Sequence, residues 1–390
     1  MRENYFVICE KIIREVQKMI VMDIKINNFF AFKNFHMNMS YPKKIVDSYI
    51  EEEFLKGRPN FRYKKVNIIM GANATGKTSF GRMIMRIFNF MDTKQYERIT
   101  DVVCDNTKEA QFAMDFITNE YVMYRIITRI APKTEEKYRS TDIKVCLKKV
   151  DIKLKDSYES CSKRLDNISI KDENNYIDEL EKIQGLSWKF EYPADEPEIY
   201  KAPTKNVERY LHILENTLKV LDPAIVRVDK IDIVENAFVL RMRNQNIIIQ
   251  DGKVIDTQIL SSGTKSGIAV AGFVSSIIDG DYGFYYCDEK FSYIQSDVEK
   301  AFLSVMISCL KSNDQLFFTT HNTDILDLPL PKHSFIFLKK DCTNTEQPIK
   351  YVSASQFLKR NTDSLRNAVD NDLFSTAPSV DMIYEIADFE

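Results

Sequence analysis

The stretch Gly71-Ala-Asn-Ala-Thr-Gly-Lys-Thr78 decides how this 390-residue chain is expected to fold. It follows the apolar run Val66 to Met70, whose length suits a buried strand. It precedes Thr78 to Phe90, where apolar residues recur at the spacing of one helix face. A strand, a glycine-rich loop and a helix in this order form the motif G-x-x-x-x-G-K-[ST]. A chance match, the alternative, does not account for the flanking strand and helix.

The chemistry of this loop is phosphate binding. Gly71 and Gly76 let the backbone turn tightly, so that its N–H groups can surround phosphates. Lys77 places a point charge on the β- and γ-phosphates, Thr78 offers a hydroxyl to Mg²⁺, and the helix adds its N-terminal dipole. The predicted nucleotide-binding residues are Gly71, Ala72, Asn73, Ala74, Thr75, Gly76, Lys77, Thr78 and Ser79.

A second motif is the apolar run Gly283 to Cys287, which ends in Asp288 and Glu289. Two carboxylates at the end of a buried strand are costly unless they meet a cation. We expect Asp288 to hold Mg²⁺ through water and Glu289 to act as the general base that polarises an attacking water. A surface turn is the alternative interpretation.

The third motif, Leu260-Ser-Ser-Gly-Thr-Lys-Ser-Gly267, stands where a helix is expected to begin, a position that suits an anion. It resembles the signature motif of ABC-type ATPases, in the variant of SMC, RecF and OLD-like proteins. The resemblance implies that Ser261, Ser262 and Gly263 contact the γ-phosphate held by a partner subunit. The alternative is a plain helix cap by Ser262 or Thr264.

The fourth motif, Thr319-Thr-His-Asn322, follows the apolar run from Gln315. It is similar to the switch histidine of the same family, which makes His321 a contact of the γ-phosphate; a turn histidine is the alternative. The order loop, signature, Asp-Glu pair and histidine is the family's order. Asp23 to Phe35 also resembles the opening strand and turn of RecF/SMC/OLD-like heads. Gln95 and Gln111 are both candidates for the family's glutamine loop.

The fold class expected from these motifs is α/β. Strands that alternate with helices favour a mainly parallel sheet covered on both faces. The resemblance implies an ABC-type ATPase head with an antiparallel β subdomain and a helical insertion. We expect residues 1–130 to form the N-terminal lobe with the loop, 131–224 a partly helical, lid-like insertion, 225–341 the C-terminal lobe with the other motifs, and 342–390 a C-terminal tail.

Composition narrows the class of protein. The net charge of −3 and the pI of about 6.0 show no basic excess for gripping nucleic acid, although nucleic acid is not ruled out as a partner. Seven scattered cysteines fit a reduced, cytoplasmic protein. No apolar run approaches the ~20 residues of a membrane span. Met1 to Val21 suggests a short amphipathic helix, and translation starting at Met1 or at Met22 both fit the pattern.

These features predict an ATPase that converts ATP to ADP and phosphate with Mg²⁺ as cofactor. The resemblance implies a homodimer with two ATP molecules between its heads. The run from Leu326 to Leu338 also resembles the AAA-15 or AbiLi-like bacterial ATPases, so we expect a dimeric, nucleotide-gated switch in antiphage defence that controls a separate effector. The alternatives are a RecF-like DNA-maintenance ATPase, which binds DNA when ATP is bound, and a scaffold with a dead ATPase site.

Overall fold

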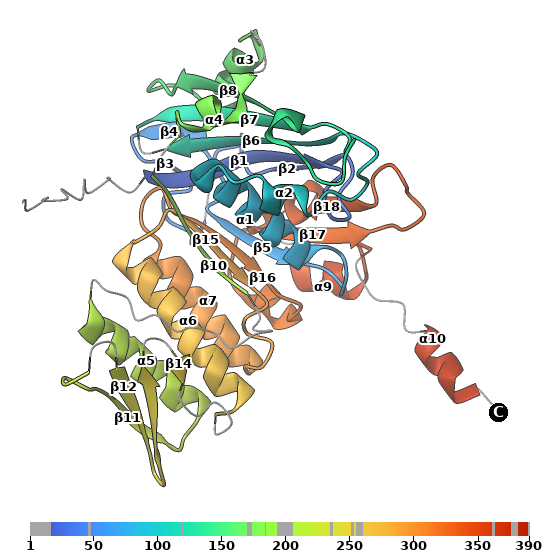
Figure 1. Cartoon of the computed structure of the whole chain (residues 1–390). Coiled ribbons are helices and arrows are strands. Elements are labelled where there is room, and N and C mark those ends of the chain that lie inside the picture. Colours follow the sequence, from blue (N-terminus) through green and yellow to red (C-terminus); the bar gives the residue numbers. More distant parts are fainter. Residues whose placement is uncertain are drawn as a thin grey trace, which may run out of the picture.

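The structure, a computed structural model, is built around one large sheet that is parallel in one part and antiparallel in the other (Figure 1). The structure describes residues 17–45, 48–118, 120–169, 174–183, 185–192, 206–234, 237–250, 253–254, 260–360, 363–375 and 381–388. Within them, 12 strands form this sheet in the order β18-β17-β5-β16-β15-β10-β1-β6-β7-β8-β9, with β2 paired to β1.

One part of the sheet is parallel and the other antiparallel. The parallel part consists of β17 (Phe335–Lys340), β5 (Val66–Met70), β16 (Gln315–Thr319), β15 (Phe284–Asp288), β10 (Leu186–Glu191) and β1 (Gln17–Asn27). The antiparallel neighbours are β2 (Phe35–Asn38), β6 (Ala110–Thr118), β7 (Val122–Ile130), β8 (Ile143–Asp151), β9 (Asn174–Asn175) and, on the far edge, β18 (Ile349–Ser353). The predicted α/β class with a parallel sheet and an antiparallel β subdomain is therefore confirmed.

Helix α1 (Lys77–Thr93) lies between the two parts of the sheet (Figure 1). Side chains of a strand alternate between faces, and those on one face of the parallel part pack on α1. Phe80 of α1 contacts both Phe35 of the antiparallel part and Phe317 of the parallel part, at ring-centroid distances of 5.6 and 6.4 Å. Because both sides of α1 are covered, the start of the helix is held rigidly.

The other face of the parallel part is covered by α6 (Ser262–Asp279) and α7 (Ser296–Cys309). On β15, Tyr285 and Cys287 face this second core, whereas Phe284 and Tyr286 face α1. Strands buried on both faces explain the continuous apolar runs from which the parallel sheet was predicted.

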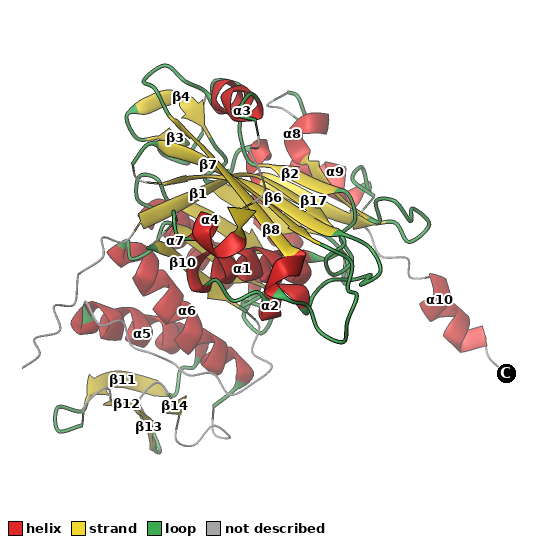
Figure 2. Cartoon of the chain, turned by 45° about the horizontal axis from the view of Figure 1, so that its top comes forward, coloured by secondary structure: helices red, strands yellow, loops and turns green. Residues whose placement is uncertain are grey.

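A smaller unit packs on α6. It consists of α5 (Val207–Leu221) and a sheet of β11 (Ile225–Lys230), β12 (Ala237–Met242), β13 (Asn246–Gln250) and β14 (Lys253–Val254), and Figure 2 shows α5 between this sheet and α6. At Gly267 of α6, a Cβ atom would lie 2.4 Å from Leu221 Cδ1, so the small residue permits the close approach of the two helices.

The remaining elements are short. They are β3 (Phe54–Leu55), β4 (Arg58–Arg62), α2 (Glu97–Thr100), α3 (Tyr158–Asp166), α4 (Tyr176–Leu180), α8 (Ala354–Phe357), α9 (Leu365–Asp370), α10 (Asp381–Tyr384), η1 (Ser140–Asp142), η2 (Thr323–Asp327), η3 (Lys332–Ser334) and η4 (Glu385–Asp388). None of the helices in the described ranges is both long enough and apolar enough to cross a membrane.

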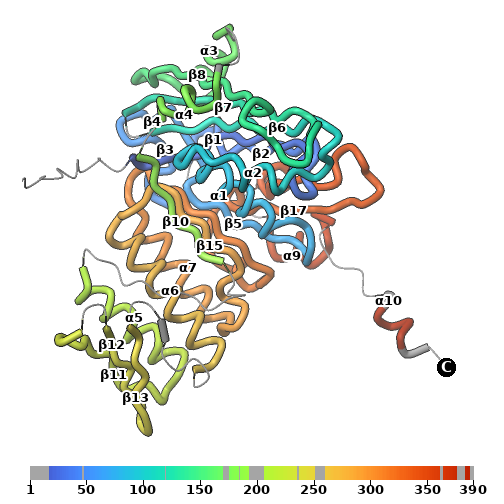
Figure 3. The backbone as a smooth tube through the Cα atoms, viewed as in Figure 1, coloured from blue at the N-terminus to red at the C-terminus, as the bar shows by residue number. Residues whose placement is uncertain are grey.

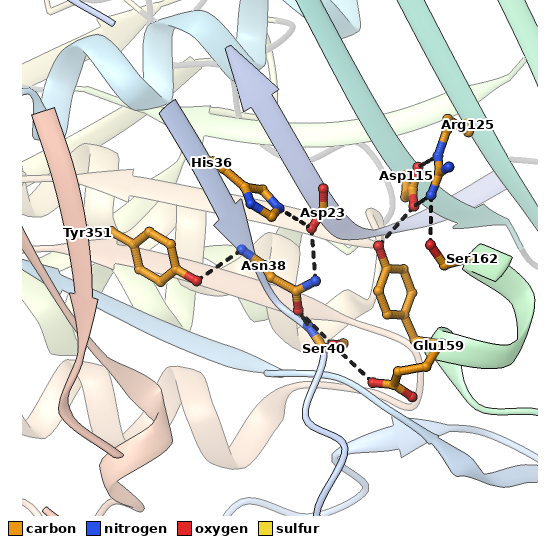
Figure 4. Close-up of polar contacts among 10 residues, drawn as sticks. Asp23, His36, Asn38, Ser40, Asp115, Arg125, Glu159, Ser162 and Tyr351 are labelled. Carbon is orange, nitrogen blue, oxygen red and sulfur yellow. Dashed lines mark hydrogen bonds and ion pairs between the residues drawn. The ribbon is translucent and has the colours of Figure 1, made fainter. Parts of the chain in front are cut away.

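Polar contacts fasten the antiparallel part to its neighbours (Figure 4). Asp23 and Asp115 are cross-strand partners on β1 and β6, an arrangement that repels unless each carboxylate is balanced. Asp23 Oδ2 lies 2.7 Å from His36 Nε2, and Asp115 is bound by Arg125 at 2.6 and 2.7 Å. Arg125 also donates to Ser162 of α3, which places α3 on the outer face of this part.

Three segments differ from the sequence-based expectation. Residues 1–16 of the expected amphipathic helix lie outside the described residues, and Gln17–Val21 belong to strand β1 because their backbone pairs with β6 and β10. The range 131–224, expected as one insertion, contributes β8 to the antiparallel part and β10 to the middle of the large sheet. Figure 3 shows β10 running beside β15, about 100 residues away along the chain. The expected tail, 342–390, supplies the edge strand β18.

Candidate functional site

The glycine-rich loop joins β5 to α1, and its backbone explains its sequence. Gly71 has φ 149° and Gly76 φ 105°, values that L side chains rarely adopt. A Cβ atom on Gly71 would also lie 2.6 Å from the Leu338 carbonyl oxygen on β17. The first turn of α1 is anchored by Tyr286, whose hydroxyl donates to the Lys77 carbonyl at 3.1 Å. The loop is therefore fixed at both ends by the parallel sheet.

Lys77 is the buried cation of this loop. Its side chain is only 4% exposed, and its Nζ donates to the carbonyls of Gly71 at 2.7 Å and Ala72 at 3.1 Å. The same ammonium forms an ion pair with Glu289 Oε1 at 3.1 Å. Lys77 thus directs its charge across the mouth of the loop toward the end of β15.

Asp288 ends β15 and is fully buried. Its Oδ1 accepts a hydrogen bond from Thr319 Oγ1 at 2.5 Å, whereas its Oδ2 is buried with no hydrogen-bond partner of normal geometry among the described residues. Burial raises the pKa of the Asp288 carboxyl above its usual range, and the Thr319 and Thr78 hydroxyls oppose this rise. A buried carboxylate oxygen without a partner, next to the Thr78 hydroxyl, is an oxygen donor set of the kind that Mg²⁺ prefers.

We expect Asp288→Asn to raise the stability of the nucleotide-free protein at neutral pH by about 1–3 kcal/mol, because it removes a buried charge that lacks full compensation. A carboxyl whose folded pKa is raised costs stability as the pH rises from its ordinary value, near 3.8, through the folded value. The gain should therefore shrink as the pH is lowered from 7 toward 4. Thermal unfolding across this range, with exposed Asp92→Asn as control, measures it. An Asp288→Asn protein that is less stable than wild type at pH 7 would contradict the assignment.

Glu289 follows Asp288 in a strained turn. Its φ is 41°, and its backbone N–H donates to Thr319 at 3.0 Å to Oγ1 and 3.2 Å to the carbonyl oxygen. These bonds exist because β15 and β16 are parallel neighbours with Asp288 opposite Thr319. The side chain is 22% exposed and lines two pockets. The adjacent Lys290 is buried and donates to the Tyr192 carbonyl at 3.0 Å, which fixes the following loop.

The first pocket, of about 280 Å³, lies at the glycine-rich loop. The site residues predicted from the sequence that line this pocket are Asn73, Ala74, Gly76, Lys77, Thr78, Ser79 and Glu289. Ala31, Lys340 and Ile349 line it as well and were missed from the sequence. Ala31 lies in the turn after β1, and the other two come from β17 and β18. Ala72 and Thr75 shape the loop instead, since Thr75 Oγ1 donates to the Ala72 carbonyl at 2.8 Å. Neither Gln95 nor Gln111 is among the lining residues.

The second pocket, of about 200 Å³, places His321 beside Glu289. Its walls are Glu289, Phe291, Ser292, Ile294, Ser296, Glu299, Thr320, His321 and Asn322. His321 comes directly after β16 and Thr320, so the parallel pairing that positions Asp288 also brings this histidine to the same edge of the sheet.

The signature stretch lies at the start of α6. Ser261 is the N-cap: its Oγ accepts from the Thr264 backbone N–H at 3.1 Å and lies 2.8 Å from Thr264 Oγ1. The alternative interpretation, a plain helix cap, predicted Ser262 or Thr264 as the capping residue. The observed N-cap is Ser261, one residue before Ser262. At Gly263 a Cβ atom would lie 3.0 Å from the Tyr293 carbonyl oxygen. None of Ser261, Ser262 and Gly263 lines the loop pocket of its own chain.

Comparisons with known proteins find similarity to solved structures alone. No family model and no curated protein matches the chain. An SMC head bound to the C-winged helix domain of ScpA matches with a TM-score of 0.50 at 15% identity, covering 87% of this chain and 99% of that one. An Smc head with an extended coiled coil bound to the C-terminal domain of ScpA, derived from Pyrococcus furiosus, gives 0.47 at 14% identity, with 87% and 98% covered.

The recombination mediator protein RecF gives a TM-score of 0.40 at 10% identity, with 86% of this chain and 99% of that one covered. At 15% identity, the likeness to the first SMC head concerns the fold alone. That fold agrees with the resemblance read from the loop, the Asp-Glu pair and the order of the motifs. The chain therefore has the fold of an SMC head domain, which is the ABC-type ATPase head fold.

Proposed function

We propose that the chain binds ATP with Mg²⁺ at residues 71–79 and hydrolyses it to ADP and phosphate. One observation carries the proposal: Lys77 of the loop forms an ion pair with Glu289 at 3.1 Å, although 212 positions separate them, and both line one pocket. A cation for phosphates and a partly exposed carboxylate at its side are the parts that phosphoryl transfer to water requires.

Each side chain then has a role in the proposed reaction. Lys77 and the loop N–H groups bind the β- and γ-phosphates. Thr78 and Asp288 would hold Mg²⁺, which neutralises phosphate charge when bound. Glu289 orients a water and accepts its proton, and His321, which lines the second pocket with Glu289, contacts the γ-phosphate.

The signature supports a site shared between two copies. Ser261, Ser262 and Gly263 begin a helix but do not line the loop pocket of their own chain. We propose that they cap the γ-phosphate bound by a second copy, so that two heads close isologously on two ATP molecules. ATP would then act as the ligand that selects the closed dimer.

Hydrolysis by the purified chain tests the enzymatic part. We expect phosphate release from ATP that requires Mg²⁺ and stops when the metal is chelated. Binding of ATP without any release of phosphate, over hours and with Mg²⁺ present, would leave only a nucleotide-binding scaffold.

The proposed biological role is antiphage defence, in which the ATP-gated dimer controls a separate effector protein. It is supported by the resemblance to AAA-15 or AbiLi-like ATPases and by the acidic balance of the chain, with a net charge of −3. The SMC head of similar fold is bound to a domain of another protein, ScpA, which shows that such a head can hold a protein partner.

The alternative role, RecF-like DNA maintenance, requires phosphate contacts that weaken steeply with salt. ATP-dependent, salt-sensitive binding to duplex DNA would favour it. Absence of DNA binding, together with co-purification of a distinct protein that depends on Glu289 and on ATP, would favour the effector role.

Lys340 gives a specific prediction about nucleotide affinity. It lines the loop pocket from β17, whereas the residue that the turn after β1 contributes to this pocket, Ala31, carries no charge. We expect Lys340→Ala to weaken ATP binding about 3- to 10-fold, the value of one charged contact near solvent. Lys339→Ala is the matched control, because adjacent strand residues face opposite sides. Titration with a fluorescent ATP analogue measures both, and equal affinities for the two variants would contradict this role of Lys340.

A further inference from the structure

A buried carboxylate of α7 lies behind the proposed catalytic groups and has no role in the reaction described above. Glu299 is only 4% exposed and lines the second pocket with Glu289 and His321. Its Oε2 accepts a hydrogen bond from Asn322 Nδ2 at 2.8 Å. Burial raises the pKa of Glu299, while hydrogen bonds from Asn322 and Thr320 and the charge of His321 oppose this rise. Because burying a carboxylate costs free energy, the hydrogen-bond partners of Glu299 indicate its role.

The hydrogen-bond partner of Glu299 is Asn322, the residue after His321. Asn322 Nδ2 also donates to Ser296 Oγ at 3.0 Å, and Asn322 Oδ1 accepts from the Asp324 backbone N–H at 3.0 Å. The Asn322 backbone N–H donates to Thr320 Oγ1 at 2.9 Å. With its amide N–H and both ends of its side chain engaged, Asn322 has one orientation, and the peptide that carries His321 is fixed with it.

The same contacts continue to a distant element. Ser296 Oγ donates to Asp324 Oδ2 at 2.5 Å, and Arg366 of α9 donates to Asp324 at 3.1 Å. Arg366 also binds Asp327 through two hydrogen bonds, at 2.6 and 2.7 Å. These outer ion pairs are partly exposed and contribute little alone. The buried bond between Glu299 and Asn322 is the one that a substitution would disturb most.

We propose that Glu299 is a positioning residue for the γ-phosphate contact: through Asn322 it holds His321 beside Glu289, and so sets the preference of the site for ATP over ADP. The inference rests on the proposed function. It adds a residue that acts through its hydrogen bond to Asn322. Misplacing a reacting group by about 1 Å can cost roughly 100-fold in rate.

A charge exchange between the two side chains tests the inference. In Asn322→Asp, two carboxylates face each other, and we expect kcat to fall about 10- to 100-fold. ATP affinity should fall while ADP affinity stays unchanged, since ADP lacks the phosphate that His321 contacts. In the double variant Glu299→Gln with Asn322→Asp, an amide again faces a carboxylate, with donor and acceptor exchanged, and most of kcat should return.

Glu299→Gln alone is the conservative control, because its carbonyl oxygen can still accept from Asn322; we expect it to stay within a few-fold of wild type. Circular dichroism and thermal unfolding establish that each variant is folded. Full activity of Asn322→Asp, failure of the double variant to recover, or equal losses of ATP and ADP binding would each overturn the inference. If wild type hydrolyses ATP and Lys77→Ala does not, such a result leaves the proposed function intact. A wild-type protein without hydrolysis overturns both.

Discussion

Lys77→Ala is expected to lower ATP turnover by at least about 100- to 1,000-fold, the cost of removing one group that stabilises charge in the transition state. The ammonium of Lys77 lies at the base of the loop pocket, where the carbonyls of Gly71 and Ala72 and the carboxylate of Glu289 surround it. Alanine leaves no cation there for the phosphates, and it leaves Glu289 without its ion-pair partner. Both ATP and ADP should therefore bind more weakly.

Calorimetric titration with each nucleotide and a phosphate-release assay measure these losses. Lys144→Ala, at an exposed position on β8, is the control for the loss of a lysine elsewhere. Unfolding curves separate a lost contact from a lost fold. Hydrolysis that survives in folded Lys77→Ala protein would mean that phosphate binds elsewhere, and the whole site assignment would be wrong.

Local sequence patterns predict the elements of this site well. The run from Val66 to Met70 forms β5, the helix expected over Thr78 to Phe90 forms α1, and the apolar run before Glu289 forms β15. In each case the signal is short in range: glycines demanded by the loop backbone, helical spacing of apolar residues, or a strand buried on both faces. The fold class follows because these elements alternate.

Long-range arrangement explains what the sequence did not predict. Lys340 and Ile349 reach the loop pocket only because β17 pairs with β5 and β18 pairs with β17. Strand order in a sheet is set by packing of distant segments, and no local pattern near Lys340 indicates a nucleotide. The same holds for β10, which lies in a stretch of sequence rich in polar residues. It nevertheless pairs in the centre of the sheet, where Trp188 and Phe190 pack on Phe88. Glu299 was missed because a carboxylate in a helix is typical of a solvated face.

Glu289→Gln is expected to trap ATP in a stable dimer, so that the mass in solution doubles from 45.5 kDa when ATP and Mg²⁺ are added. The amide keeps the size of the side chain, and its oxygen can still accept from Lys77, but it cannot take a proton from water. In the proposed shared site the second copy contributes Ser261, Ser262 and Gly263, which do not line the loop pocket of their own chain.

Light scattering after size exclusion measures the mass, with ADP in place of ATP as the ligand control. Adding Ser261→Arg to Glu289→Gln supplies the matched control: the bulky side chain at the start of α6 should block closure, so the double variant should bind ATP as a monomer. A Glu289→Gln protein that retains ATP but stays at the mass of one chain would contradict the shared site. Each copy would then bind its nucleotide alone, and the start of α6 would need another role than capping a phosphate.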